Sequence, residues 1–161
     1  MGLLHKPEIV HFEHIEIPVK SVIRRMGYPN SGHNGFQQIK SLLDKELIKA
    51  KPMLHPKGIY RMLSVKERHV QSIVFHEVDF LIQSEKVCRM LKESEPILLI
   101  MATIGGELES EVEELFSRGE ATQAFILDAI VSETADAVAD RLHWEILSDL
   151  AKERGMEVTP R

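Results

Sequence analysis

The chain has 161 residues, the length of one ordinary domain. Hydrophobic residues make up 43% of it, which is enough for a packed core and argues against a disordered chain. It carries 20 lysines and arginines against 25 aspartates and glutamates, a net charge of −5. This balance argues against nucleic-acid binding through a basic face. A single cysteine, Cys88, excludes an intrachain disulfide and a four-cysteine zinc site.

The N-terminal residues lack the basic start and apolar run of a signal peptide. The longest apolar run, from Ile97 to Ala102, is far shorter than the roughly 20 residues that cross a bilayer. We therefore expect a soluble, cytoplasmic protein with no membrane partner and no nucleic-acid partner.

The N-terminal third is divided by prolines and glycines. Pro18 at a first helical position and Gly27 as a stop predict a short helix over residues 19–26. Apolar residues three and four apart predict an amphipathic helix from Phe36 to about Ala50.

The middle of the chain is rich in β-branched and aromatic residues. It predicts strands over 59–65 and 70–82. The second is expected to be half-buried because Val78, Phe80 and Ile82 alternate with Glu77, Asp79 and Leu81. Ser84 is the expected N-cap of a helix over 85–92, in which Cys88 serves as a buried structural thiol. The apolar run over 97–104 predicts a central strand buried on both faces.

The C-terminal third is helical in pattern. One helix is expected over 107–117 with Gly119 as its stop, and another over 121–154. At roughly 1.5 Å per residue the second helix is longer than a small domain is wide. We therefore expect a kink or a break near Val131, with the apolar first half buried nearly all round. Central strands and mainly C-terminal helices favour an α+β fold.

Two possible sites are disfavoured by the sequence. His11 and His14 lie three apart in an extended segment, where side chains three apart point to opposite faces, so no metal site is expected. The Gly105-Gly106 turn precedes a helix start of the kind that binds phosphate, but the acids that begin at Glu107 would repel an anion. No residue is assigned a catalytic role.

Four acids lie on the part of the long helix up to residue 140: Asp128, Glu133, Asp136 and Asp140. Two interpretations of them remain open. They are hydrogen-bonded acids at a helix–sheet junction, or some of them face a cleft and bind a cationic ligand. Asp128 follows a strongly apolar run, and we expect it to act mainly on stability.

A longer pattern supports the second interpretation. It comprises residues 102–109 (ATIGGELE), 115–119 (LFSRG), 127–129 (LDA) and 134–140 (TADAVAD), preceded by 17–18 (IP) and 22–28 (VIRRMGY). In these positions the chain resembles the activation (reactivation) domain of vitamin-B12-dependent methionine synthase, in its short, free-standing form.

The resemblance implies an α+β fold with a bent antiparallel sheet, helices packed around it and a long C-terminal helix. It implies S-adenosylmethionine as the ligand, and reductive remethylation of cob(II)alamin as the role. The implied partners are a cobalamin-binding methionine synthase domain or subunit, which carries the cobalamin, and a flavodoxin-type reductant. An alternative is a non-catalytic docking module for a corrinoid protein, suggested by the acid-rich stretch Glu107–Glu120.

The resemblance also implies two ligand contacts. Asp136 matches an acid of the long helix near the S-adenosylmethionine site, and Arg161 matches the start of an Arg-x-x-Pro-Gly-Tyr motif. A carboxylate suits the ammonium or sulfonium charge, and a guanidinium suits the carboxylate of the ligand. Residues 1–161 are therefore expected to form a single activation-like domain, cut short at its C-terminal end after Arg161.

Overall fold

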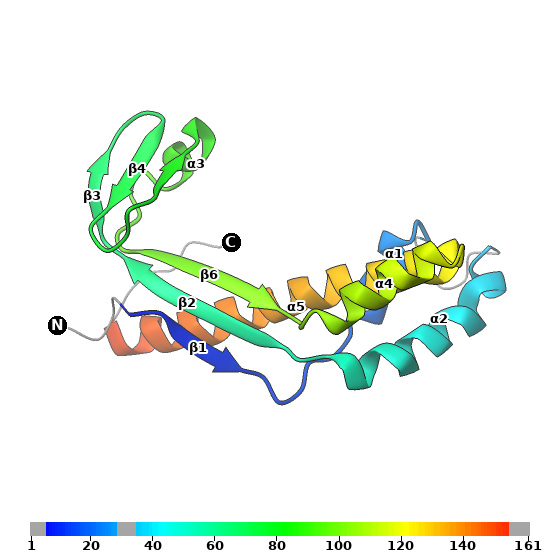
Figure 1. Ribbon diagram of the computed structural model, residues 1–161. Coiled ribbons are helices and arrows are strands. Elements are labelled where there is room, and N and C mark those ends of the chain that lie inside the picture. Colours follow the sequence, from blue (N-terminus) through cyan, green and yellow to red (C-terminus); the bar gives the residue numbers. More distant parts are fainter. Residues whose placement is uncertain (1–5, 29–34, 155–161) are drawn as a thin grey trace. The chain divides into compact units, whose positions relative to one another are not determined.

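The computed structural model describes residues 6–28 and 35–154 (Figure 1). The chain divides into two compact units. Unit 1 comprises Met1–Ile9, Ile59–Met101 and Glu145–Arg161, and unit 2 comprises Val10–Gly58 and Ala102–Trp144. Helices and small antiparallel sheets together confirm the expected α+β class.

Unit 1 contains a three-stranded antiparallel sheet in the order β3-β4-β5. Its strands are β3 (Val65–Arg68), β4 (Ser72–Phe75) and β5 (Leu81–Gln83). Ile73 of β4 pairs with Ile82 of β5, and the β3–β4 register shifts between Val65 and Glu67. The helix α3 (Glu85–Met90) follows, and the Ser84 hydroxyl accepts a hydrogen bond from the Val87 amide at 3.4 Å, which confirms the expected N-cap.

The core of unit 1 is one cluster from three strands and a helix. Its buried members are Leu63, Ile73, Phe75, Cys88 and Ile97. The thiol is packed among apolar side chains, as expected of a structural cysteine.

The prediction of a single strand over 70–82 is wrong, because residues 76–80 form an irregular segment with bends between β4 and β5. Glu77 explains the interruption. Its carboxylate accepts a hydrogen bond from the Ser64 amide at 2.9 Å, and its carbonyl accepts one from the Arg61 guanidinium at 3.0 Å. These contacts use the polar groups of Glu77 outside a strand ladder, so the alternating sequence folds as a turn.

A second three-stranded sheet has the order β1-β2-β6. Its strands are β1 (Glu8–His11), β2 (Lys57–Leu63) and β6 (Ile97–Thr103). The expectation that β6 is buried on both faces is wrong, since burial alternates and Leu99 and Met101 are 43% and 68% exposed. A continuous apolar run suits a parallel sheet covered on both sides, whereas an antiparallel sheet commonly covers only one face.

Unit 2 is built mainly from helices. They are α1 (Val19–Arg25), α2 (Phe36–Ala50), the short 3-10 helix η1 (Lys51–Met53), α4 (Glu107–Ser117) and much of α5 (Ala121–Arg154). The predicted positions of α1, α2 and α4 are confirmed. Gly27 and Gly119 have φ of 86° and 78° just beyond α1 and α4, a conformation that glycine adopts without strain.

The long helix α5 differs from its prediction in two respects. It is continuous, without the break expected near Val131. Its first half buries Leu127 and Ile130 but leaves Phe125 50% exposed and Asp128 exposed, so it has an outer face. A period of 3.6 residues places these positions on different sides of the helix, and only one side meets the core. No helix in the described ranges is both long and apolar enough to cross a membrane.

Candidate functional site

Two acids of α5, Asp136 and Asp140, lie on its exposed side, and Glu133 near them is partly buried. Asp136 and Asp140 are exposed and one turn apart, and Glu133 lies one turn before Asp136. Spacings of three and four residues place successive side chains next to each other on a helix surface. The helix therefore presents a short row of carboxylates within unit 2.

A guanidinium from α1 meets this row. Arg25, in the last turn of α1, donates a hydrogen bond to the Glu133 carboxylate, with 3.2 Å between Nη1 and Oε1. Only 17% of the Glu133 side chain is exposed, against 45% of the Arg25 side chain. The ion pair thus links α1 to α5 one turn before Asp136.

The structure locates one of the two predicted ligand contacts. Asp136 is on the surface of α5, whereas Arg161 lies outside the described residues. Their convergence on one ligand stays a prediction. The pairing of Arg25 with Glu133 was not predicted, because it joins positions 108 apart in sequence. The available signal was weak, namely a basic residue at the end of a short helix in the family-like N-terminal pattern.

Asp128 was expected to act mainly on stability because burying an unpaired carboxylate is costly. The structure leaves Asp128 exposed, so this cost is absent. The Gly105 turn also has a local explanation. The Gly105 amide donates to the Thr103 hydroxyl at 3.1 Å, and His55 Nε2 lies 3.2 Å from the Glu107 carboxylate. Within residues 6–28 and 35–154, no group of three or more His, Cys, Asp or Glu side chains is arranged to bind a metal ion.

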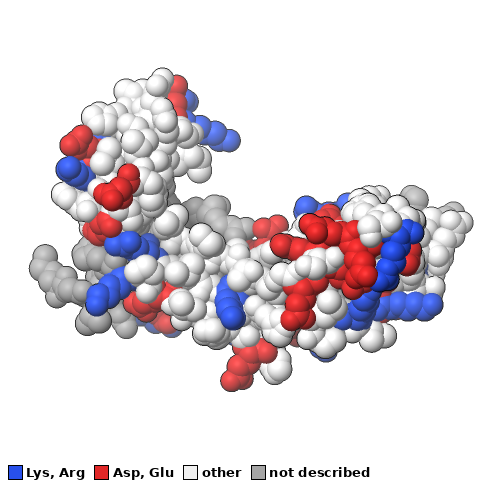
Figure 2. Space-filling model, viewed as in Figure 1, with Lys and Arg blue, Asp and Glu red and all other residues white. Residues whose placement is uncertain are grey.

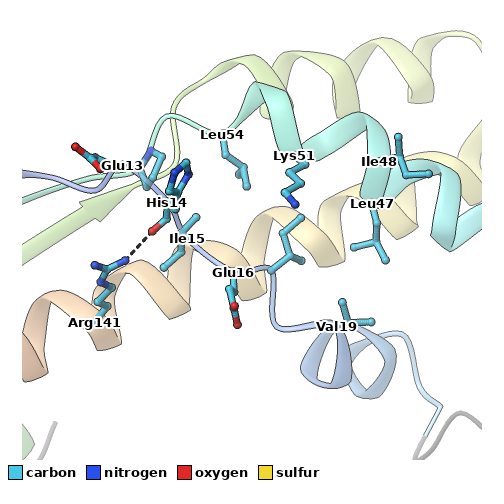
Figure 3. Close-up of a pocket in the computed structure, with 12 residues that line it drawn as sticks. Glu13, His14, Ile15, Glu16, Val19, Leu47, Ile48, Lys51, Leu54 and Arg141 are labelled. Carbon is cyan, nitrogen blue, oxygen red and sulfur yellow. Dashed lines mark hydrogen bonds between the residues drawn. The ribbon is translucent and has the colours of Figure 1, made fainter.

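A separate pocket of about 940 Å³ opens in unit 2 (Figure 3). It lies between the extended segment 13–17 and the end of α2, and α5 contributes one residue to it. Most of its lining is apolar. The lining residues are Glu13, His14, Ile15, Glu16, Ile17, Val19, Leu47, Ile48, Lys51, Leu54, Pro56 and Arg141.

The cation that α5 adds to this pocket is held by the protein itself. The Arg141 guanidinium donates to the His14 carbonyl at 2.6 Å and lies 4.9 Å from the centre of the Phe12 ring. These contacts tie the extended segment to α5 and therefore shape the pocket wall.

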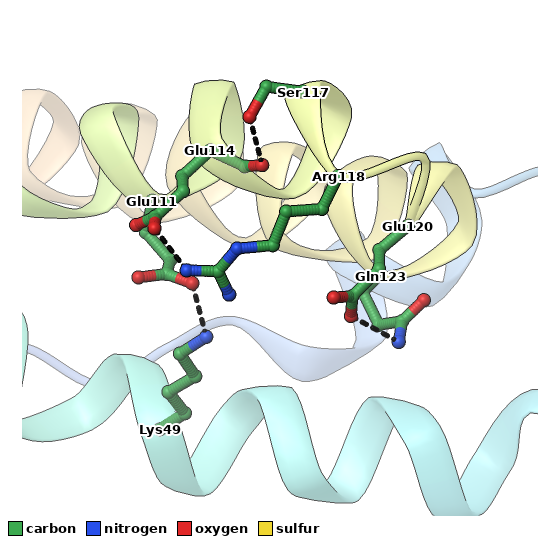
Figure 4. Close-up of polar contacts among 7 residues, drawn as sticks. All are labelled: Lys49, Glu111, Glu114, Ser117, Arg118, Glu120 and Gln123. Atoms are coloured by element: carbon green, nitrogen blue, oxygen red, sulfur yellow. Dashed lines mark hydrogen bonds and ion pairs between the residues drawn. The ribbon is translucent and has the colours of Figure 1, made fainter.

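Acidic side chains gather along α4 on the surface of unit 2 (Figure 2). Two of these acids form ion pairs, and Glu120 just beyond α4 accepts a hydrogen bond from a neutral amide (Figure 4). Lys49 of α2 bonds to Glu111 at 2.6 Å, Arg118 pairs with Glu114, and the Gln123 amide donates to Glu120 at 2.9 Å. Much of the acidic surface is thus engaged in contacts within the unit.

One carboxyl of this region is buried. Glu46 of α2 is 7% exposed, and its Oε2 has no hydrogen-bond partner among the described residues. Burial raises the pKa of Glu46, and the neighbouring charge of Lys49 opposes the rise while Glu111 and Glu120 add to it. The folded protein therefore holds the proton of this carboxyl more tightly than a solvent-exposed glutamate does.

Comparison with known proteins bears on the fold. No family model matches the sequence, and no curated protein matches it. A solved structure described as the crystal structure of the MetH reactivation domain bound to AdoHcy matches with a TM-score of 0.58 and 14% identity. The match covers 87% of this chain and 55% of that one, so the chain spans about half of the matched structure. At this identity the likeness shows a shared fold.

Proposed function

We propose that this chain is an S-adenosylmethionine-binding module that supports reductive remethylation of cobalamin in a cobalamin-dependent methionine synthase. The observation that carries the proposal is the fold shared with the AdoHcy-bound MetH reactivation domain. Residues 102–140, which carry most of the sequence resemblance, form the end of β6, α4 and part of α5. The proposal treats the chain as an accessory protein, since the methyl donor and the cobalamin supply the reactive groups.

The exposed carboxylates of α5 fit such a ligand. S-adenosylmethionine carries an ammonium and a sulfonium, and α5 presents Asp136 and Asp140 in solvent, whereas Arg25 is already paired with Glu133. In the proposal, Asp136 binds a cationic group of the ligand and Arg161 binds its carboxylate. The bound ligand would supply an electrophilic methyl group to cobalamin carried by a methionine synthase domain or subunit.

The role of this chain's residues is then to bind and orient. Glu133 and Arg25 neutralise each other and hold α1 against α5, which fixes the helix surface on which Asp136 stands. A binding group placed by a rigid helix loses little freedom when the ligand arrives. The reducing electron is proposed to come from a flavodoxin-type donor, and the protein is proposed to act in the cytoplasm.

The first prediction concerns Asp136. Asp136→Asn removes the charge and keeps the shape, so S-adenosylmethionine affinity should fall about tenfold, the worth of one charge-assisted hydrogen bond. Titration calorimetry with S-adenosylmethionine and with AdoHcy measures it. The unfolding midpoint without ligand should change little, because substitutions at exposed positions usually alter stability by less than about 0.5 kcal/mol.

Asp128→Asn is the matched control, since it neutralises another exposed acid of the same helix. It should leave affinity unchanged. No heat and no thermal shift with millimolar S-adenosylmethionine on the unaltered chain would overturn the proposed function. Equal loss of affinity in both variants would point to a general electrostatic effect and remove Asp136 from the site.

A non-catalytic docking module for a corrinoid protein is the second candidate. The acidic surface along α4 favours it, because a charged patch steers association with an oppositely charged partner. Capture of a purified cobalamin-binding domain that is equally strong with and without S-adenosylmethionine would support this candidate over the first.

A further inference from the structure

The pocket beside the segment 13–17 has the composition of a site for an amphiphile. Ile15 and Ile17 contribute from the extended segment, and Leu47, Ile48 and Leu54 contribute from the end of α2 and the residues after η1. Its volume of about 940 Å³ lies at the upper end of the range of small-molecule pockets. Ile48 is 76% exposed, so an apolar ligand would remove apolar surface from water at this site.

One cation of the pocket has no ion-pair partner among the residues that the structure describes. Lys51, directly after α2, makes no ion pair with a carboxylate within residues 6–28 and 35–154. Figure 3 shows its ammonium pointing into the space between α2 and the extended segment. Arg141 differs, because its guanidinium already bonds to the His14 carbonyl.

The two acids that line the pocket, Glu13 and Glu16, point away from the Lys51 ammonium. Figure 3 shows the carboxylate of Glu16 pointing away from the Lys51 ammonium, and that of Glu13 pointing outward from the other end of the segment. The inner part of the pocket thus combines apolar walls with one positive charge.

We propose that this pocket binds a monocarboxylate with an apolar body, of the fatty-acid type, whose carboxylate is bound by Lys51. The apolar body would lie against Leu47, Leu54 and Ile17, and the carboxylate would accept hydrogen bonds from the ammonium. Asp136 does not line this pocket, so the site is separate from the proposed S-adenosylmethionine contacts.

The proposal is tested by calorimetric titration of the full chain with hexanoate, octanoate and decanoate below their micelle concentrations. Burial of each methylene should raise affinity about fourfold, which gives a rising series. Octylamine should bind more weakly than octanoate, because the ammonium of Lys51 repels its head group.

Lys51→Gln should weaken octanoate binding about tenfold, the value of a hydrogen bond to a charged group, while binding of neutral 1-octanol stays unchanged. Lys45→Gln removes a charge from the exposed part of α2 outside the pocket and should change neither. Ile48→Ser keeps the cation and removes part of the apolar rim, so it should weaken octanoate and 1-octanol alike.

Three results would overturn the proposal: no octanoate binding, tighter binding of octylamine than of octanoate, or an equal response of octanoate and 1-octanol to Lys51→Gln. Both lysines are exposed, so the variants should fold, and circular dichroism checks this. Failure here leaves the proposed function standing, because S-adenosylmethionine binding is measured separately on Asp136→Asn.

Discussion

Unit 2 and unit 1 build their cores differently. In unit 2, α5 contributes a series of buried side chains on one side, among them Leu127, Ile130 and Leu142, while its other side carries Asp128 and Asp136 in solvent. In unit 1, the core is shared between β2, β4, α3 and β6, each of which contributes one or two residues. One helix in unit 2 thus serves both packing and the proposed site, and its two faces should respond separately to substitution.

The largest effect is expected on the inner face of α5. Leu127→Ala leaves a cavity at a side chain with no exposed surface and should cost about 2–5 kcal/mol of unfolding free energy. Urea unfolding followed by circular dichroism measures it. Phe125→Ala, half-exposed on the same helix, is the control and should cost much less. Equal costs would mean that the two faces of α5 are not distinct.

The next effect comes from the buried carboxyl of α2. Its pKa is raised in the folded state, so folded protein holds this proton more tightly than unfolded protein. The contribution of Glu46 to the unfolding free energy is therefore fully present at a pH below 4.5, the ordinary pKa of glutamate. This contribution is lost as the pH rises through the raised pKa of the folded state. Glu46→Gln removes that loss, and should raise the unfolding free energy at pH 7 by on the order of 1 kcal/mol.

The measurement is urea unfolding at pH 4 and at pH 7. The gain from Glu46→Gln should be present at pH 7 and shrink toward pH 4, where the wild-type carboxyl is protonated in both states. Glu109→Gln, at an exposed position of α4, should show no such pH dependence. A destabilised Glu46→Gln variant at pH 7 would contradict a raised pKa of Glu46 caused by burial.

A smaller effect is expected from unit 1. Ser84→Ala removes the side-chain N-cap of α3, and the expected cost is about 0.5–1 kcal/mol. The 3.4 Å hydrogen bond is long, which places the effect at the low end of the range for caps. Amide hydrogen exchange of α3 should accelerate more than exchange in unit 2. A uniform acceleration across the chain would show that α3 opens only with the whole protein.

The smallest effect is expected from the outer face of α5. Asp128→Ala should change the unfolding free energy by less than about 0.5 kcal/mol, since the residue is exposed and carries no burial cost. Thermal unfolding of this variant beside Leu127→Ala gives the sharpest comparison, because the two positions are adjacent in sequence. A loss above 1 kcal/mol would restore the structural role that the sequence pattern favoured.

Local sequence rules determined most of the elements. Pro18 and Gly27 bound α1, Ser84 caps α3, and Gly119 ends α4, because each residue acts on the backbone within a turn of its own position. The α+β class followed from the order of these elements. The fold expected from the resemblance is shared with the matched reactivation domain, although identity over the match is only 14%.

Only the tertiary structure decided which sides of these elements are covered. The apolar run of β6 does not specify whether one face of the strand or both are buried. The apolar residues before Asp128 suggested a buried acid, but the structure exposes it. Contacts between distant segments settled other points, such as the Glu77 contacts that interrupt the expected strand and the Arg25–Glu133 pair. Burial and pairing depend on which surfaces meet in space, and residues close in sequence do not specify those meetings.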